Sequence, residues 1–226
     1  VGDAALMLDA LSGNHPGDRH APPAPPVAYT EAAAAPTRRL RVALSFRAPF
    51  AIVPKLLDDE VEELTRRTAE LLRDLGHEVI ERDPDYGLIG TSFVPRSTVA
   101  LREWAERLGE TASFDRRTKE NFLLGRLLAG PGLTGARGLE HIFRRRIGRM
   151  FGDVDVLLTP TTASPPLPIG SIDGLSPWET HKVVVGSCPY AWAWNVLGWP
   201  GVSVPAGLTA AGLPVGAQLL GPANSE

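Results

Sequence analysis

Charge is divided very unequally along the 226 residues of this chain. Residues 1–150 carry 22 basic and 21 acidic side chains, whereas residues 151–226 carry one basic and five acidic side chains. Charged side chains are almost always kept at the protein surface, so a stretch this poor in charge does not form a solvated helical layer. We therefore expect residues 151–226 to supply apolar core strands and loops.

The same stretch raises the question of a membrane span, because no charged residue occurs from 183 to 225. Prolines, among them Pro189, Pro200, Pro205 and Pro214, and several glycines interrupt it, whereas a helix that crosses lipid needs about 20 mostly apolar residues in a row. Strands that are covered on both faces also read as continuous apolar runs. We expect a buried sheet region here and no membrane partner.

The remaining composition narrows the function classes. The net charge is −3 and the sequence pI is about 6.0, so no basic field indicates a nucleic-acid partner. The single cysteine, Cys188, excludes an internal disulfide framework and favours a reducing, cytoplasmic compartment. It has no basic neighbour in the sequence and is expected to be a buried, inert thiol. The five histidines show no HxxxH or HExxH spacing, so we expect no metal and no cofactor.

The first 37 residues are expected to form a helix and a connection. Residues 1–13 repeat apolar residues at helical spacing, at Val1, Ala4, Ala5, Leu8 and Leu11. No N-cap residue or Met precedes this helix, and only GPANSE follows the last predicted strand, so we expect the chain to be truncated. Residues 14–37 are rich in Pro and Ala, which favours a surface connection over a partner-binding polyproline segment.

Residues 38–150 are expected to form a β-α-β unit followed by a helical layer. A strand at Leu40–Phe46, a helix opened by Asp59 and Glu62, and a second strand at 77–82 are typical of a parallel pair. The helix should bury one face, formed by Val61, Leu64, Thr68, Leu71, Leu72 and Leu75. No GxGxxG joins the first strand to the helix, so dinucleotide binding loses its main support.

Three helices are predicted in the layer that follows, over 95–109, 116–129 and 138–151. The last one carries the basic run Arg144–Arg146 with Arg149, and its apolar residues are Ile142, Phe143, Ile147 and Met150. We interpret the basic run as a solvated helix face rather than as a phosphate or RNA contact.

Residues 151–226 should contain the apolar strands. The run DVLLTPTT at 155–162 is typical of a strand that ends in a turn, and a short helix is expected near 181–194. Two further strands are predicted around a turn at Ala210–Leu213, where Gly212 is free to adopt a positive φ.

Three blocks of this sequence resemble the amidase signature family. The last stretch contains Asn195, the Trp199-Pro200 step, a strand ending in Pro205-Ala206-Gly207, and GLPVGAQ from Gly212 to Gln218. Upstream lie DVLLTPTT and the opening VGDAALMLDALSG, in the order that is found in that family. The resemblance implies a three-layer α/β/α domain with a mixed, mostly parallel sheet, of which residues 1–226 would be the C-terminal part.

The resemblance also implies amide hydrolysis by a Lys, a Ser in a cis peptide and a nucleophilic Ser, through an acyl-enzyme intermediate. This chain departs from that pattern, because it has no Ser-Ser pair and none of its three lysines precedes a Gly/Ser-rich signature. We therefore assign no catalytic residue to this chain. The triad is expected in the missing N-terminal half, and the chain alone is predicted to be inactive.

The resemblance places the substrate's acyl pocket beside the segment that precedes Asn195. We expect Cys188, Tyr190, Trp192 and Trp194 to line it, with Thr159 as a further candidate at the carboxyl end of a strand. The alternative is that the aromatic rings only pack the core.

Three functions stay open from the sequence. The first is an amidase acting on a small-molecule amide, with a homodimer as one assembly open to it. The second is the A subunit of an aminoacyl-tRNA amidotransferase, against which the modest charge argues. The third is a non-catalytic fragment that only binds a partner, which an exposed apolar surface would support.

Overall fold

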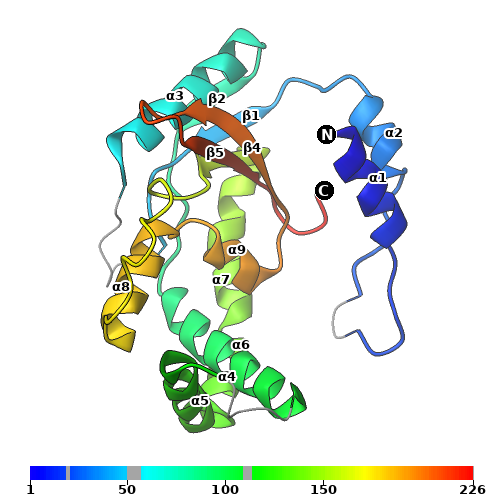
Figure 1. Ribbon diagram of the computed structural model, residues 1–226. Helices are drawn as coiled ribbons and strands as arrows, with labels where there is room; N and C mark the ends of the chain where they lie inside the picture. The colour runs from blue at the N-terminus through cyan, green and yellow to red at the C-terminus, as the bar shows by residue number, and fades with distance from the viewer. Residues whose placement is uncertain (19–20, 50–56, 109–113, 226) are drawn as a thin grey trace.

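A computed structural model describes residues 1–18, 21–49, 57–108 and 114–225, and its centre is a five-stranded sheet (Figure 1). The described strands lie side by side in the order β2-β1-β3-β5-β4. Their bounds are β1 Arg41–Leu44, β2 Glu78–Glu81, β3 Val156–Pro160, β4 Gly201–Leu208 and β5 Pro214–Leu220.

The sheet is mixed, as predicted. β1 pairs in parallel with β2 and with β3, whereas β5 pairs antiparallel with β3 and with β4. Parallel pairs are therefore half of the described pairings rather than most of them. The reason lies in the connections: a helix separates β1 from β2, whereas the turn at 209–213 is too short for anything but an antiparallel return.

Helices cover both faces of the sheet, because neighbouring residues on each strand point to opposite sides. On one face Val42, Leu44 and Leu158 pack with Ala69 of α3 (Asp59–Asp74). On the other face, Ala43 and Leu157 belong to a larger core. That core includes residues of α7 (Glu140–Gly148) and α9 (Trp192–Leu197), which lie together under the sheet (Figure 1).

Helix α3 confirms the predicted β-α-β unit but corrects its details. Its N-cap is Asp58, whose carboxylate accepts hydrogen bonds from the backbone N–H groups of Glu60 and Val61 at 2.9 and 3.4 Å. The fully buried positions are Val61, Thr65 and Ala69. Of the predicted face, Leu71 and Leu75 are 58% and 66% exposed, because Leu71 lies beside the buried stripe and Leu75 is the C-cap residue.

The helical layer below the sheet contains α4 (Gly90–Leu108), α5 (Arg116–Leu128), α6 (Pro131–Gly138) and α7, which a 3₁₀ turn at Arg149–Gly152 follows. The prediction located three of these helices with other limits and missed α6. α4 begins at Gly90 and continues through Pro95, and the helix predicted over 138–151 corresponds to α7 and the 3₁₀ turn, with Gly138 still in α6. No helix among the described residues is long and apolar enough to cross a lipid bilayer.

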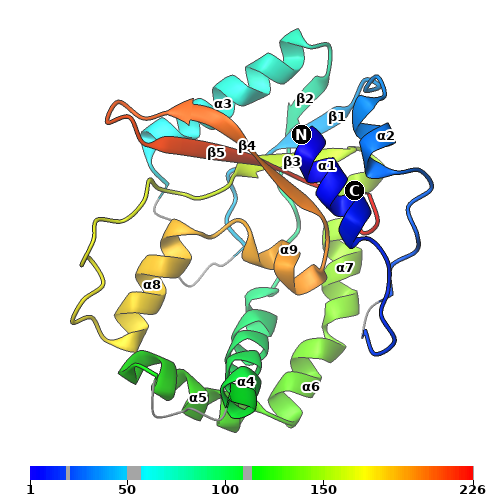
Figure 2. The same cartoon turned by 45° about the vertical axis from the view of Figure 1, so that its right-hand side comes forward.

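The N-terminal helix α1 (Gly2–Leu11) is confirmed, but its apolar stripe is not buried. It packs chiefly against α2 (Tyr29–Ala34), a helix inside the stretch that we predicted to be an irregular connection. Asp9 fixes the pair, since its carboxylate accepts hydrogen bonds from the backbone N–H groups of Tyr29 and Thr30. Both helices stand beside the sheet (Figure 2), so Leu8 and Leu11 stay 45% and 74% exposed.

Two helices replace the single short helix predicted near 181–194. α8 (Pro177–Ser187) begins at a capping box, in which Ser176 and Glu179 each accept a hydrogen bond from the other's backbone N–H. α9 follows after residues 188–191, which include Pro189. The proline explains the break, because it disfavours helical backbone at the preceding residue.

The hairpin of β4 and β5 is confirmed with its turn, and it contains a bulge between Pro205 and Gly207. Gly207 has a φ of +149°, and a Cβ added there would lie 2.7 Å from the Cδ2 atom of Leu64 on α3. A Cβ at Gly216 would lie 2.8 Å from the Ser203 hydroxyl oxygen. A side chain at position 207 or 216 would therefore force Leu64 or Ser203 to move, and at position 207 it would also have to adopt an unfavourable positive φ.

Candidate functional site

The predicted pocket residues lie on the strand β3 and on the segment that leads into α9. Tyr190 and Thr159 are fully buried, and Trp192 and Trp194 are 5% and 2% exposed. Cys188 is exposed at the C-cap of α8. The structure thus brings the four residues of 188–194 into one segment, of which Cys188 is the member that reaches the surface.

The two tryptophans of α9 pack among other rings. The Trp192 ring lies 5.2 Å from that of Phe93, and the Trp194 ring makes edge contacts with Tyr86 at 6.3 Å and Trp199 at 6.0 Å. The indole N–H of Trp194 also donates to the carbonyl of Gly221, at 3.0 Å. These contacts give α9 a fixed seat in the core beneath the sheet.

Tyr190 and Thr159 tie the site to the strands. The Tyr190 hydroxyl donates to the carbonyl of Phe46, just beyond the end of β1, at 3.2 Å, and burial raises the pKa of this phenol. The Thr159 hydroxyl accepts a hydrogen bond from the Gln218 side chain at 3.0 Å and donates to the carbonyl of Pro160. Both residues therefore satisfy buried polar groups and hold neighbouring elements together.

The exposure of Cys188 corrects the prediction of a buried thiol. Its side chain is exposed because α8 ends there and the chain turns toward Pro189. Partial burial of the sulfur still raises the pKa of the thiol, and a thiol with a raised pKa is poorly nucleophilic at neutral pH. These properties do not favour Cys188 as a nucleophile.

Two cavities flank this region. One, of about 730 Å³, lies at the carboxyl ends of β1 and β2, where the Ser45 hydroxyl donates to Asp83 at 2.6 Å. The other, of about 520 Å³, lies between α4, α6, α7 and α9 and is lined by Arg96, Glu140 and Asn195 among others. None of the five predicted pocket residues is among the described residues that line these two cavities.

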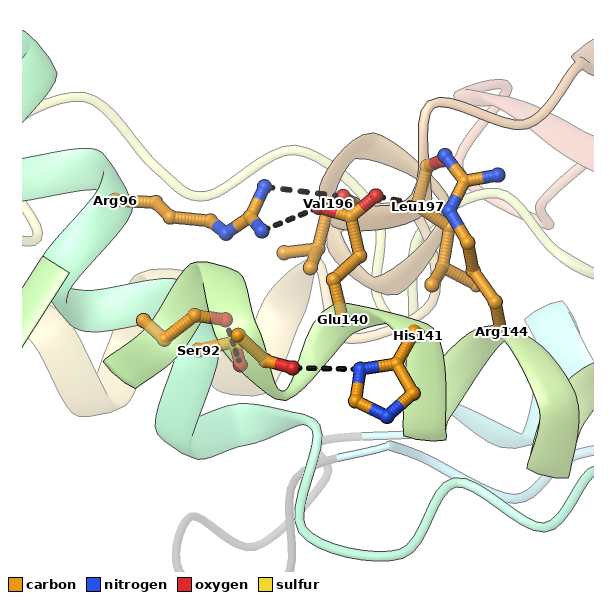
Figure 3. Close-up of polar contacts among 9 residues, drawn as sticks. Ser92, Arg96, Glu140, His141, Arg144, Val196 and Leu197 are labelled. Carbon is orange, nitrogen blue, oxygen red and sulfur yellow. Dashed lines mark hydrogen bonds and ion pairs between the residues drawn. The ribbon is translucent and has the colours of Figure 1, made fainter. Parts of the chain in front are cut away.

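A cluster of charged side chains at the second cavity was missed by the sequence analysis. Glu140 on α7 pairs with Arg96 of α4 at 2.5 Å and with Arg144 of α7 at 2.8 Å (Figure 3). Partial burial raises the pKa of Glu140, but the hydrogen bonds from the two arginines outweigh it and leave the pKa below its usual value. In the sequence, the four-residue spacing between Glu140 and Arg144 is typical of an ion pair along a helix and could have indicated this cluster.

The cluster corrects our interpretation of the basic run. Arg144 is half-buried and donates to the carbonyl of Leu197 at the end of α9, and Arg146 pairs with Asp85 at 2.8 Å. Arg145 does face solvent. Of the apolar residues predicted opposite the run, Phe143, Ile147 and Met150 are buried, whereas Ile142 is 40% exposed.

No group of three or more His, Cys, Asp or Glu side chains in the described part of the chain is arranged to hold a metal ion. His77 accepts a hydrogen bond from the backbone of Leu40, and His141 contacts the carbonyl of Gly138. The His181 ring stacks on Trp178, and His20 lies outside the described residues.

The arrangement of sheet and helices matches solved structures of amide-cleaving enzymes. The structure of 6-aminohexanoate cyclic dimer hydrolase complexed with substrate aligns with a TM-score of 0.85, at 23% identity over 99% of this chain and 50% of that chain. A bacterial aryl acylamidase of the amidase signature family aligns with a TM-score of 0.70, at 22% identity over 97% of this chain and 47% of that chain.

Sequence comparison agrees with the fold. AmiA2 of Mycobacterium tuberculosis, a protein named as an amidase, is 46% identical over 227 residues, which cover 100% of this chain and 46% of AmiA2. A more distant relative is the A subunit of the glutamyl-tRNA(Gln) amidotransferase of Rhodospirillum rubrum. It is 31% identical over 248 residues, covering 98% of this chain and 48% of that protein.

These solved structures share with this chain a fold built on a mixed sheet between helices. The family model named Amidase matches residues 1–226, and the chain belongs to that family. The chain spans about half the length of the curated relatives that it matches. The family expectation from the sequence is thereby confirmed.

Proposed function

We propose that the protein to which this chain belongs hydrolyses a carboxylic amide to an acid and an amine or ammonia, through an acyl-serine intermediate. The match of the amidase family to the whole of residues 1–226 carries this proposal. The reacting serines are assigned to the other half of the protein, because no Ser-Ser pair occurs in these 226 residues. Nucleophilic serines of this kind need an adjacent base and an oxyanion site to act.

We propose that this chain supplies one wall of the acyl pocket. Cys188 would contact the substrate, because it is the exposed member of the predicted set. Tyr190, Trp192, Trp194 and Thr159 would shape the wall from behind, since all four are buried. A small-molecule amide and the N-terminal half of the same protein are the partners that this role requires. The single cysteine supports a reducing, cytoplasmic location.

The tRNA amidotransferase alternative is less well supported. The relative with that name is 31% identical to this chain, whereas AmiA2 is 46% identical. The net charge of −3 also offers no general attraction for a tRNA. We therefore prefer a neutral amide or arylamide as the substrate.

The test compares two preparations on a panel of simple arylamides and aliphatic amides. The complete protein should release the amine and should react with a serine-directed fluorophosphonate, whereas the 226-residue chain alone should do neither. Incubation of the complete protein with glutamyl-tRNA(Gln) and glutamine as the amide donor addresses the alternative, and formation of glutaminyl-tRNA would favour it. Turnover of an arylamide by the pure 226-residue chain would overturn the assignment of the serines to the other half.

A further inference from the structure

Helix α9 is too short to be stable without contacts from other helices. It has six residues, Trp192–Leu197, whereas isolated helices shorter than about 12 residues are marginal in water. Its N-cap, Ala191, offers no side-chain hydrogen bond. The last carbonyls of a helix have no partner within it, so the carbonyls of Val196 and Leu197 need donors from elsewhere.

Two arginines from other helices supply those donors. Arg96, from α4, donates to the carbonyl of Val196 at 3.4 Å, and Arg144, from α7, donates to the carbonyl of Leu197 (Figure 3). Cations are favourable at the C-terminal end of a helix, where the unpaired carbonyls concentrate negative charge. The end of α9 is therefore held from both sides.

Glu140 holds the two arginines in place. One carboxylate oxygen accepts from Arg96 at 2.5 Å and the other from Arg144 at 2.8 Å, so a single side chain orients both guanidinium groups. The side chains of Glu140 and Arg96 are 20% and 24% exposed. Each arginine uses different nitrogens for Glu140 and for the α9 carbonyl, which a lysine with one nitrogen reproduces poorly.

We propose that Arg96, Glu140 and Arg144, here called the α9 clamp, are positioning residues that fix α9 and with it the substrate wall at 188–194. The part of this proposal that concerns substrate rests on the proposed function. The clamp touches neither Cys188 nor the rings of Trp192 and Trp194 through any hydrogen bond that is described. It acts by setting where the backbone that carries them lies.

The clamp acts together with other attachments of α9. Most residues of the helix are buried in the core, and the Trp194 indole donates a hydrogen bond to Gly221, at the end of β5. If the clamp is released, the C-terminal turn of α9 should loosen first, because the start of the helix stays packed in the core. Trp199, which follows that turn and is partly buried against Trp194 and Phe151, should then become more accessible to small quenchers.

The experiment uses the complete protein and the pair Arg144→Gln and Arg145→Gln. These neighbouring arginines lie on the same helix, but Arg144 reaches α9 whereas Arg145 faces solvent. Acrylamide quenching of tryptophan fluorescence is measured in a Trp104→Phe/Trp178→Phe background, because those two indoles are 61% and 55% exposed and would mask the signal. Circular dichroism at the same temperature establishes that each variant is folded.

We expect Arg144→Gln to raise the quenching constant about twofold and the KM for an arylamide about tenfold, with kcat within about twofold, because uniform binding of the substrate is lost. Arg145→Gln should match the parent in both measurements. Arg144→Lys should recover part of the loss, with KM raised about threefold. Arg96→Gln provides a second variant, from α4, with the same expected pattern.

The possible outcomes separate the two proposals. Unchanged quenching in folded Arg144→Gln and Arg96→Gln overturns the clamp. Raised quenching with an unchanged KM overturns its link to the substrate wall. If the parent protein cleaves no amide, the proposed function fails and the substrate part falls with it, while the quenching result still decides whether the clamp holds α9.

Discussion

Helices α8 and α9 follow one another in the chain, yet they are held in opposite ways. α8 is stabilised by its own sequence: Ser176 and Glu179 form the capping box, and Pro177 occupies the first turn. α9 ends locally at Gly198, which adopts the left-handed conformation and donates its backbone N–H to the carbonyl of Trp194. Its N-cap gives no side-chain hydrogen bond, and its last two carbonyls accept from side chains that are 53 and 100 positions away along the chain. The first arrangement depends on four neighbouring residues, and the second depends on three separate helices meeting correctly.

The two helices differ in whether nearby or distant residues fix their ends. α8 has 11 residues and α9 has six, so both helices need packing to be stable, but the shorter α9 also relies on α4 and α7 to satisfy its C-terminal carbonyls. Its position therefore reports the state of the whole helical layer. A substrate wall built on such a helix is sensitive to changes made far from the substrate.

The largest difference between the two helices is expected when one tryptophan is removed from each. Trp194→Ala on α9 should lower the free energy of unfolding by about 4 kcal/mol, because a large buried ring leaves a cavity. Trp178→Ala on α8 should cost less than about 1 kcal/mol, since this ring is 55% exposed. Urea unfolding of the complete protein measures both, and equal losses would contradict the contrast.

The next effect concerns the clamp itself. Glu140→Gln should lower the free energy of unfolding by about 2 kcal/mol, because it leaves two partly buried guanidinium groups without a negative partner. Glu120→Gln is the control, since Glu120 forms a surface pair with Arg116 at 2.8 Å and should change stability by less than about 0.5 kcal/mol. A loss at Glu140 no larger than at Glu120 would show that the cluster is an ordinary surface pair.

Acid should erase the Glu140 effect. The pKa of Glu140 is depressed in the folded protein, so its stabilisation is fully present above the usual value of 4.5 and is lost as the pH falls through the lower folded value. The difference in unfolding free energy between the wild type and Glu140→Gln should therefore shrink steadily between about pH 5 and pH 3. A difference in unfolding free energy that grows toward low pH would contradict a lowered pKa of Glu140 in the folded protein.

A smaller effect is expected at the cap of α8. Ser176→Ala removes the hydroxyl that accepts from the backbone N–H of Glu179, and it should cost about 1 kcal/mol in unfolding free energy. Ser171→Ala, an exposed serine in the preceding loop, should be neutral. The cap variant should leave acrylamide quenching of Trp192 and Trp194 unchanged, because α9 does not depend on α8 for its ends. Increased quenching would show that the two helices are coupled.

The smallest effect should be at Cys188, between the two helices. Cys188→Ser should change the free energy of unfolding by less than about 0.5 kcal/mol, because the side chain is exposed. The native protein should nevertheless lose one reactive thiol when this substitution is made. Labelling with a maleimide should become faster as the pH rises, since burial raises the pKa of this thiol. Equal labelling of both proteins would mean that Cys188 is shielded.

The sequence predicted what depends on neighbouring residues. The strands around 40–46 and 155–160, the parallel β-α-β unit and the final hairpin were all found, because alternation, a helix face and a turn glycine are local signals. The capping box of α8 was equally readable as Ser-Pro-Trp-Glu, and overlooking it led to the wrong start for that helix.

The site was only partly predictable, for a physical reason. The segment 188–194 was proposed as a substrate wall from its likeness to a family, and that role stays a prediction. Which of its residues are exposed depends on how α8 ends and how α9 packs. Cys188 was expected inside and lies outside. Arg96 and Glu140 lie on different helices and are 44 positions apart in the chain, so no sequence spacing predicts their ion pair.

The bulge on β4 gives a different meaning to the residues that reveal the family. Pro205-Ala206-Gly207 marks the bulge where the hairpin passes close to Leu64 of α3, and Gly207 has a φ of +149°, which other residues rarely adopt. That run therefore reflects a backbone conformation and a close approach between a strand and a helix. At this point, the residues by which the family is recognised serve the fold rather than the reaction.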